Sequence, residues 1–139
     1  MILLDASGLF AFLNDRQPKH ADMQRVLEIE SGPLVLSPFV LAEVGYLVQA
    51  RAGVDAELAL LADVAAGAYA LEALSADDVA EAADVVERYR DLRIGLADAS
   101  IVVLAGRYRT NRVLTLDERH FRSLRTPQGE PFVILPADA

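Results

Sequence analysis

The chain has 139 residues, no cysteine, 53% hydrophobic residues and a formal net charge of −8. This length predicts a single domain over residues 1–139, which buries about two-thirds of the surface of its unfolded chain. The absence of cysteine excludes a disulfide framework, thiolate metal ligands and a thiol nucleophile, and it fits a reducing cytoplasm. We find no apolar segment long enough to predict a membrane span and no basic region before the first apolar run, so we expect a cytoplasmic protein.

A short apolar run occupies residues 1–4 and ends at Asp5. Apolar residues without polar alternation predict a strand buried on both faces, as in parallel sheets. Asp5 then lies at the carboxyl end of this strand, where ligands bind in open α/β sheets. The structural alternative is that Asp5 or Ser7 caps the helix expected over residues 8–13. A second helix is expected to begin at Pro18.

A second buried strand is expected over residues 34–36, and Ser37 and Pro38 then predict the N-cap and first residue of a helix that ends at Gly53. Within this helix, three- and four-residue spacing places Glu43 on a face that is otherwise apolar. Burial of an unpaired carboxylate is costly, so we expect Glu43 to meet a cation, a metal ion or a polar cleft. The apolar members of this face, whose helical spacing favours the core over base stacking, are Phe39, Tyr46, Leu47 and Ala50.

The middle of the chain predicts a helix over residues 55–66, a short strand over 69–71 and a further helix that starts with a capping box at Ser75. The stretch 94–106 is apolar nearly all round, which predicts a buried helix. Asp98 lies in the first turn of this helix. It either complements the positive end of the helix dipole or serves chemistry.

Residues 113–116 predict another buried strand, and Asp117 follows its end as Asp5 follows the first strand. Asp117 is alternatively the cap of a helical turn over residues 118–121. Residues 132–135 predict a last strand at an edge of the sheet. Strands that alternate with helices and are apolar throughout predict an α/β fold, with a mainly parallel sheet, helices on both faces and right-handed crossovers.

The charge is distributed unevenly along the chain. Residues 1–87 hold 4 basic and 15 acidic side chains, a net charge of −11, whereas residues 88–125 hold 9 arginines and 4 acids, a net charge of +5. The overall acidity argues against a protein that coats nucleic acid. The basic segment carries the candidate phosphate contacts, and a solvated helix rim is the alternative.

Four acids follow two strand ends, begin a buried helix and interrupt an apolar helix face: Asp5, Asp117, Asp98 and Glu43. Each has its own structural explanation, but together they predict one acidic pocket. Crowded carboxylates repel one another unless a cation neutralises them, and hard oxygen ligands select Mg²⁺ or Mn²⁺. Such ions activate water and hold phosphate oxygens, so the predicted chemistry is phosphodiester hydrolysis.

The chain resembles the PIN-domain ribonucleases and, within them, the VapC toxins of bacterial toxin-antitoxin pairs. The resemblance covers nearly the whole chain and is carried by four segments in this order: Leu4–Ser7, Ser37–Glu43, Arg93–Ala99 and Leu114–Phe121. It implies a three-layer α/β/α sandwich around a mainly parallel sheet of four to five strands.

The resemblance also implies functions for individual residues. The catalytic quartet is Asp5, Glu43, Asp98 and Asp117, of which Asp5, Asp98 and Asp117 hold Mg²⁺ or Mn²⁺. Ser7 and Thr115 are polar neighbours of the quartet. Apart from the resemblance, the side chains of the basic segment 88–125 that we expect to contact RNA are Arg93, Arg112, Arg119 and His120.

Partners follow from the same resemblance. It implies a homodimer and a VapB-like antitoxin that wraps the toxin and inserts a peptide into the acidic groove, in a heterotetramer or larger complex. The substrate is a structured RNA, either transfer RNA or the sarcin-ricin loop of ribosomal RNA, and cleavage leaves a 5′-phosphate. The segment 89–98 and the helix start at Ser37 favour the ribosomal loop. The alternative function is a catalytically idle PIN-like module that docks a basic peptide.

Other α/β enzymes do not fit. Position 7 is serine, whereas aspartyl phosphatases have a second carboxylate there. Neither a phosphate-binding P-loop nor the glycine pattern of dinucleotide-binding folds is present.

Overall fold

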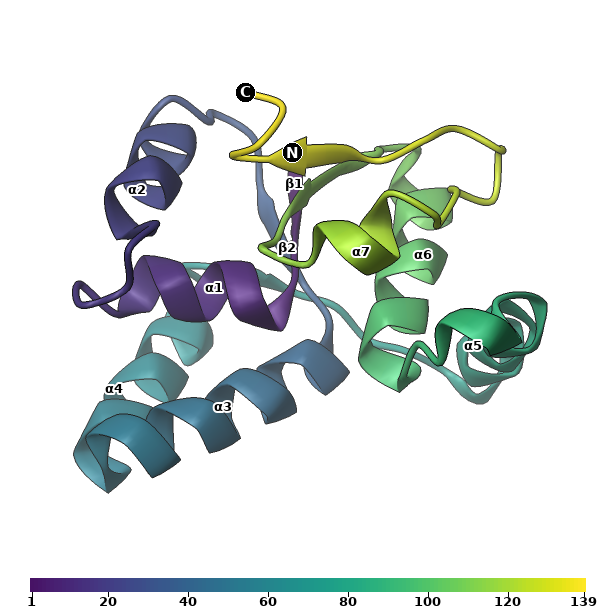
Figure 1. Cartoon of the computed structure of the whole chain (residues 1–139). Helices are drawn as coiled ribbons and strands as arrows, with labels where there is room; N and C mark the ends of the chain where they lie inside the picture. Colours follow the sequence, from purple (N-terminus) through teal and green to yellow (C-terminus); the bar gives the residue numbers. More distant parts are fainter.

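Five short strands form one parallel sheet in the order β3-β2-β1-β4-β5 (Figure 1). The computed structural model describes residues 1–139. The strands are β1 (Ile2–Leu4), β2 (Leu34–Leu36), β3 (Ala70–Leu71), β4 (Arg112–Leu114) and β5 (Val133–Leu135). The helices are α1 (Ala6–Leu13), α2 (His20–Glu28), α3 (Pro38–Ala52), α4 (Val54–Ala65), α5 (Ala76–Arg88), α6 (Leu96–Tyr108) and α7 (Glu118–Phe121), with a 3-10 turn η1 (Arg90–Leu92) before α6. The predicted α/β fold class is confirmed, and all strand pairs are parallel.

Strand β1 is the centre of the sheet. Leu3 pairs with Val35 of β2 on one side and with Val113 of β4 on the other. All three residues of β1 are buried, as an apolar run without alternation requires when helices cover both faces. The backbone N–H of Asp5 still donates to the carbonyl of Leu114, at 3.1 Å, so the first acid is fixed directly beyond the strand.

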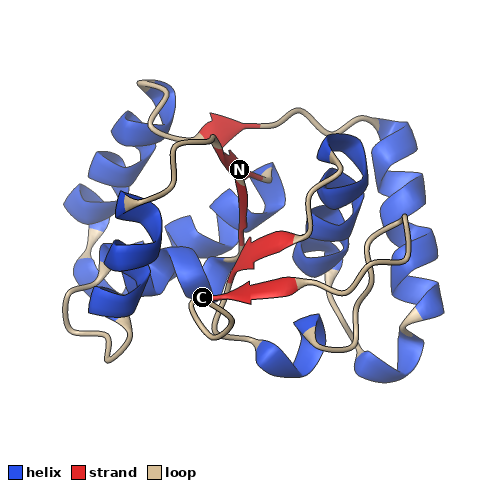
Figure 2. Cartoon of the chain, turned by 90° about the horizontal axis from the view of Figure 1, so that it is seen from above, coloured by secondary structure: helices blue, strands red, loops and turns tan.

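Helices lie on both sides of the sheet (Figure 2). Helix α1 packs against α2 and α3, and α3 packs against α4, whereas α5 packs against α6. The chain runs outward from β1 through β2 to β3 and then returns to β4 and β5. Right-handed crossovers in opposite directions place α1 to α4 on one face and α5 to α7 on the other.

The direction of the chain reverses around β1, because its two neighbours are β2 and β4. A crevice at the carboxyl ends of the strands forms at such a reversal point, and open α/β sheets bind their ligands there. Asp5 follows β1 and Asp117 follows β4, so both acids lie at this edge.

The core-facing side of α3 differs from the sequence prediction. The buried side chains of α3 are Val40, Val44 and Val48, whereas Glu43 is exposed and Tyr46 is 73% exposed. The helix carries two apolar stripes offset by one position, and periodicity alone did not identify the one that packs on the sheet. Glu43 therefore projects from the outer face and is not part of the core.

Local signals set most of the helix ends. Ser37 caps α3 by accepting from the backbone N–H of Phe39, and the capping box at Ser75 is present. Helix α2 begins at His20, two residues after the predicted start at Pro18. Helix α6 is buried as predicted. None of the helices combines the length and the apolar character that crossing a membrane requires.

Candidate active site

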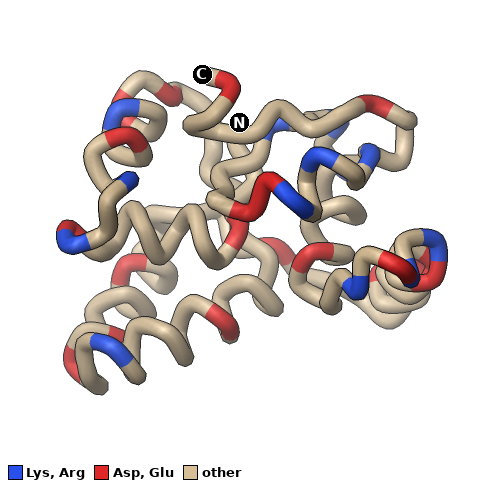
Figure 3. Tube along the Cα trace, viewed as in Figure 1, with Lys and Arg blue, Asp and Glu red and all other residues tan.

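All four predicted acids line one hollow of about 320 Å³ at the carboxyl edge of the sheet. Four separate segments contribute: the end of β1, the second turn of α3, the first turn of α6 and the end of β4. Figure 3 shows acidic parts of the trace meeting near the middle of the molecule, where α1 and α7 begin. We call this hollow the acid pocket. Its lining residues are Asp5, Ala6, Ser7, Glu43, Leu47, Gly95, Asp98, Asp117 and His120.

Asp5 is the most buried of these acids, at 5% exposure. Its Oδ2 atom accepts from Oγ1 of Thr115 at 2.6 Å and from Oγ of Ser7 at 2.9 Å. Burial raises the pKa of Asp5, and these hydroxyl donors oppose the rise. Asp5 is the N-cap residue of α1 but its side chain makes no cap hydrogen bond, so the capping alternative for this carboxylate is wrong.

Ser7 and Thr115 also fix the backbone that carries Asp117. Oγ of Ser7 accepts from the N–H of Leu116 at 3.0 Å, and Oγ1 of Thr115 accepts from the N–H of Asp117 at 2.9 Å. The two hydroxyls lie 3.2 Å apart. Each hydroxyl thus joins the end of β4 to the carboxylate that follows β1.

Gly8 permits this close approach of α1 to β4. A Cβ atom at this position would lie 2.2 Å from the carbonyl oxygen of Leu114. A side chain at Gly8 would therefore push α1 away from the strand end and separate Ser7 from Thr115.

Asp98 and Glu43 face the same crowded charge. Burial, and after it the neighbouring carboxylate of Asp5, together raise the pKa of Asp98 to about 6. The pKa of Glu43 is raised by partial burial and then by Asp5. Asp98 lies in the first turn of α6, as the dipole alternative required, but its pKa is raised, which is opposite to the effect of a helix N-terminus acting alone.

Asp117 has two contacts with the residue three positions later. Its Oδ1 atom accepts from the backbone N–H of His120 at 3.0 Å, so the predicted cap of α7 is present. Its Oδ2 atom lies 2.9 Å from the His120 ring nitrogen Nδ1. A capping function and a place in the acid pocket are thus compatible for this residue.

The ring of His120 lies beside two of the acids, Asp98 and Asp117, which the sequence did not predict. Nδ1 lies 3.3 Å from Oδ2 of Asp98 as well as near Asp117, yet it is buried and neither contact has hydrogen-bond alignment. The sequence signal was present, because residues three apart share a helix face. It did not indicate that α6 would bring Asp98 to the same ring.

The donor atoms fit a divalent cation. Asp98, Asp117 and His120 each offer a ligand atom, and these atoms lie within 4.8 Å of one another. The buried Nδ1 without a hydrogen-bond partner and the raised pKa of Asp98 both indicate groups arranged for a positive charge. Carboxylate oxygens with one imidazole suit Mg²⁺ or Mn²⁺.

The predicted RNA-contacting arginines do not share one location. Arg93 and Arg119 are exposed on segments that adjoin the acid pocket, two residues before Gly95 and two after Asp117. Arg112 begins β4, forms an ion pair with Glu30 and donates to the carbonyl of Met1 at 3.4 Å. It therefore lies at the amino edge of the sheet, and the fold does not bring it to the acids.

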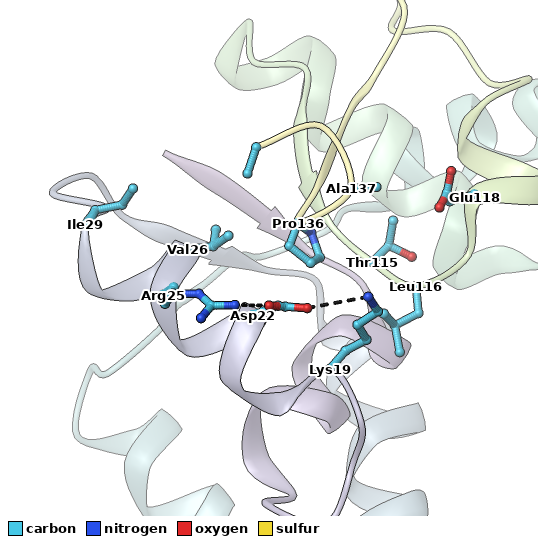
Figure 4. A pocket seen from close by; sticks show the side chains of 11 residues that line it. Lys19, Asp22, Arg25, Val26, Ile29, Thr115, Leu116, Glu118, Pro136 and Ala137 are labelled. Atoms are coloured by element: carbon cyan, nitrogen blue, oxygen red, sulfur yellow. Dashed lines mark hydrogen bonds and ion pairs between the residues drawn. The ribbon is translucent and has the colours of Figure 1, made fainter.

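A larger hollow of about 550 Å³ lies between α2 and the C-terminal segment (Figure 4). Its cations Lys19 and Arg25 both contact Asp22. These ion pairs compensate the charges of the hollow locally. The hollow has no lining residue in common with the acid pocket.

The chain is similar to known proteins in both sequence and fold. The model of the family described as "PIN domain" matches residues 2–126. Ribonuclease VapC26 of Mycobacterium tuberculosis is 46% identical over 135 residues, which cover 97% of this chain and 100% of that protein. The crystal structure of Mycobacterium tuberculosis VapC20, described as a sarcin-ricin loop cleaving toxin, superposes with a TM-score of 0.78 at 21% identity. The match covers 84% of this chain and 90% of that one.

Proposed function

Because this chain belongs to the PIN domain family and, within it, to the VapC ribonucleases, we propose that it is a Mg²⁺- or Mn²⁺-dependent endoribonuclease toxin that acts through Asp5, Glu43, Asp98 and Asp117. The observation that carries this proposal is the convergence of these acids, from four separate segments, in the acid pocket. The raised pKa values of Asp5, Glu43 and Asp98 support a site that works with a bound cation.

Different residues of the chain would perform different steps of hydrolysis. Asp5, Asp98 and Asp117 would hold the metal ion, and Nδ1 of His120 would be a further ligand atom beside Asp98 and Asp117. Ser7 and Thr115 orient Asp5 by donating to its Oδ2 atom. Bound Mg²⁺ or Mn²⁺ supplies Lewis-acid chemistry, which neutralises the phosphate oxygens and makes water a better nucleophile. Glu43, which is exposed at the edge of the pocket, would take the proton of the attacking water. The bond from phosphorus to O3′ breaks, O3′ receives a proton, and a 5′-phosphate remains.

The substrate that we propose is the ribosomal sarcin-ricin loop, with transfer RNA as the competing class. The local resemblance of residues 89–98 and of the α3 start at Ser37 to toxins acting on that loop supports this choice. The description of VapC20 names this loop, but at 21% identity the match supports only a shared fold and not a shared RNA target. Cleavage in the cytoplasm would then inhibit translation.

We further propose a homodimer that a VapB-like antitoxin neutralises. A basic peptide segment of the antitoxin would compensate the four carboxylates and occupy the acid pocket. Co-purification with the product of a small neighbouring reading frame, with loss of RNA cleavage in the complex, is the expected result.

The deciding experiment incubates the purified chain with total transfer RNA and with intact ribosomes, in Mg²⁺ or Mn²⁺ and again with a chelator. Asp98→Ala is the test variant, and Asp91→Ala, an exposed acid outside the acid pocket, is the matched control. We expect cleavage of ribosomal RNA that is lost on chelation and in Asp98→Ala but kept in Asp91→Ala. Cleavage of transfer RNA with uncut ribosomes would overturn the target. Equal activity in Asp98→Ala would overturn the site.

A catalytically idle module that docks a basic peptide is the second candidate, because an acidic pocket also attracts a basic peptide, but the presence of all four acids argues against it. The two differ in metal dependence. An idle module binds the peptide without metal and cleaves no RNA in any condition, whereas the proposed enzyme cleaves RNA only with metal.

A further inference from the structure

Tyr46 is an aromatic residue that the fold leaves exposed beside the acid pocket. It lies on the outer face of α3 at 73% exposure, where the sequence predicted a core position. Exposure of a large aromatic ring to water forgoes the burial that stabilises other aromatic residues. Its position relative to Glu43 suggests a use for the ring.

A second hollow, of about 400 Å³, is lined by Tyr46 together with Ala42, Glu43 and Leu47. Glu43 and Leu47 also line the acid pocket, so the two hollows adjoin along α3. We call the second hollow the Tyr46 shelf. The acid pocket is acidic, whereas three of the four residues that line the shelf are apolar or aromatic.

Glu43 and Tyr46 are close enough along α3 to contact one phosphodiester and the nucleoside attached to it. Tyr46 follows Glu43 by three residues on α3, a rise of about 4.5 Å at 1.5 Å per residue. A phosphodiester held at the acids therefore has its attached nucleoside within reach of the shelf. Unpaired bases are recognised by stacking on aromatic side chains, and single strands are held in this way without regard to sequence.

The two hollows together offer both kinds of surface. The acid pocket is lined by carboxylates, whereas Leu47 and Tyr46 line the shelf beside it. This combination suits a ligand that has both a phosphate and an apolar base face.

We propose that Tyr46 stacks on an unpaired base next to the scissile phosphodiester, so that the enzyme selects a nucleotide splayed out of an RNA helix. This inference rests on the proposed function. A second copy of the chain is a weaker occupant of the shelf. Glu43 lines the shelf as well, and a protein surface packed on it would bury that carboxylate, which carries a cost that RNA with a metal ion avoids.

The test measures binding rather than cleavage. All variants carry Asp98→Asn, which prevents hydrolysis and lowers the repulsion of phosphates. The probes are a fluorescein-labelled eight-residue oligoadenylate and the same ribose-phosphate backbone without bases, in Mg²⁺. The ratio of the two affinities reports base contacts. Tyr46→Ala is compared with Tyr46→Phe and with Leu58→Ala, which removes an exposed apolar side chain on α4, outside both hollows.

We expect Tyr46→Ala to reduce the preference for the probe with bases by about tenfold, as loss of one stacked base does. Tyr46→Phe and Leu58→Ala should keep the preference. An unchanged affinity ratio in Tyr46→Ala overturns the proposal. If Tyr46→Ala also dissociates a dimer, the shelf is the contact with a second copy of the chain.

The failure of this inference can be distinguished from that of the proposed function. If the chain with native Asp98 cleaves RNA only without a chelator, while Tyr46→Ala leaves the ratio of the two probe affinities unchanged, only the stacking proposal is wrong. If no RNA is cut but the ratio depends on Tyr46, the shelf binds bases and the enzymatic proposal falls.

Discussion

The hydroxyls of Ser37 and Ser100 lie 2.7 Å apart in the buried contact between α3 and α6. Ser100 donates its proton to the carbonyl of Ala97 at 2.6 Å, so Ser37 is the donor in the pair. Ser37 in turn accepts from the N–H of Phe39 at 3.2 Å. This chain of bonds fixes the first turn of α3, which leads to Glu43, against the first turn of α6.

Ser100→Ala should therefore destabilise the fold, because it leaves the Ser37 hydroxyl as a buried donor without an acceptor. We expect a loss of about 1 to 3 kcal/mol in the free energy of unfolding, measured by urea denaturation. Ser123→Ala removes an exposed hydroxyl and should change stability by less than about 0.5 kcal/mol. Equal stability of the two variants would show that the Ser37 hydroxyl finds another partner.

Thr115→Val should weaken metal binding. The substitution keeps the shape of the side chain but removes the hydroxyl that donates to Asp5 and accepts from the N–H of Asp117. Loss of a hydrogen-bond partner to a ligating carboxylate typically costs about 10- to 100-fold in metal affinity. Titration with Mn²⁺ measures it, and Thr115→Ser should restore most of the affinity. Wild-type affinity in Thr115→Val would remove this hydroxyl from the support of the site.

The metal-free protein should lose stability as the pH rises from about 4 to about 6. Asp98 has a pKa of about 6 in the folded chain against a usual value of 3.8, so in this range the folded state binds more protons than the unfolded state. The free energy of unfolding then falls as pH increases, by up to about 3 kcal/mol for a shift of this size.

The control for this pH effect is Asp98→Asn, whose side chain has no proton to lose. The difference in melting temperature between the wild type and this variant, measured in a chelator, should shift in favour of the variant between pH 4 and pH 6. Addition of Mg²⁺ at pH 7 should stabilise the wild type more than the variant. Parallel pH curves would contradict the raised pKa of Asp98.

Arg119→Gln should weaken RNA binding and lower its salt dependence. Arg119 is exposed on α7 next to the acid pocket, and loss of one phosphate contact reduces the slope of log affinity against log salt by about 1. Arg93→Gln should behave in the same way.

Arg112→Gln is the matched comparison. Its ion pair with Glu30 is at the opposite edge of the sheet, where the amino terminus and Gly32 also bond Glu30 and hold its pKa at about 2. We expect the salt slope to stay at the wild-type value and the melting temperature to fall. A changed slope for Arg112→Gln with no change for Arg119→Gln would place the RNA path on the other side of the molecule.

The amino-acid sequence by itself determined the strands and the acids that follow them. Buried parallel strands require apolar runs, so residues 2–4 and 113–114 were recognisable, and a carboxylate after such a run lies at the carboxyl edge. The buried helix α6 was equally clear, because it is apolar on all sides. The same positional rule puts Arg112, which precedes the apolar part of its strand, at the edge opposite Asp117, a signal that its inclusion among the expected RNA-contacting side chains overlooked.

Only the tertiary structure decided which surfaces meet. Helix α3 carries two apolar stripes of similar period, and packing on α1, α4 and α6 selected the one containing Val44, which left Tyr46 exposed. The contact of His120 with Asp98 joins residues 22 positions apart through the packing of α6 beside α7. Periodicity identifies the residues that share a face of one element. The partner of that face depends on the summed packing of the whole chain, which no local pattern contains.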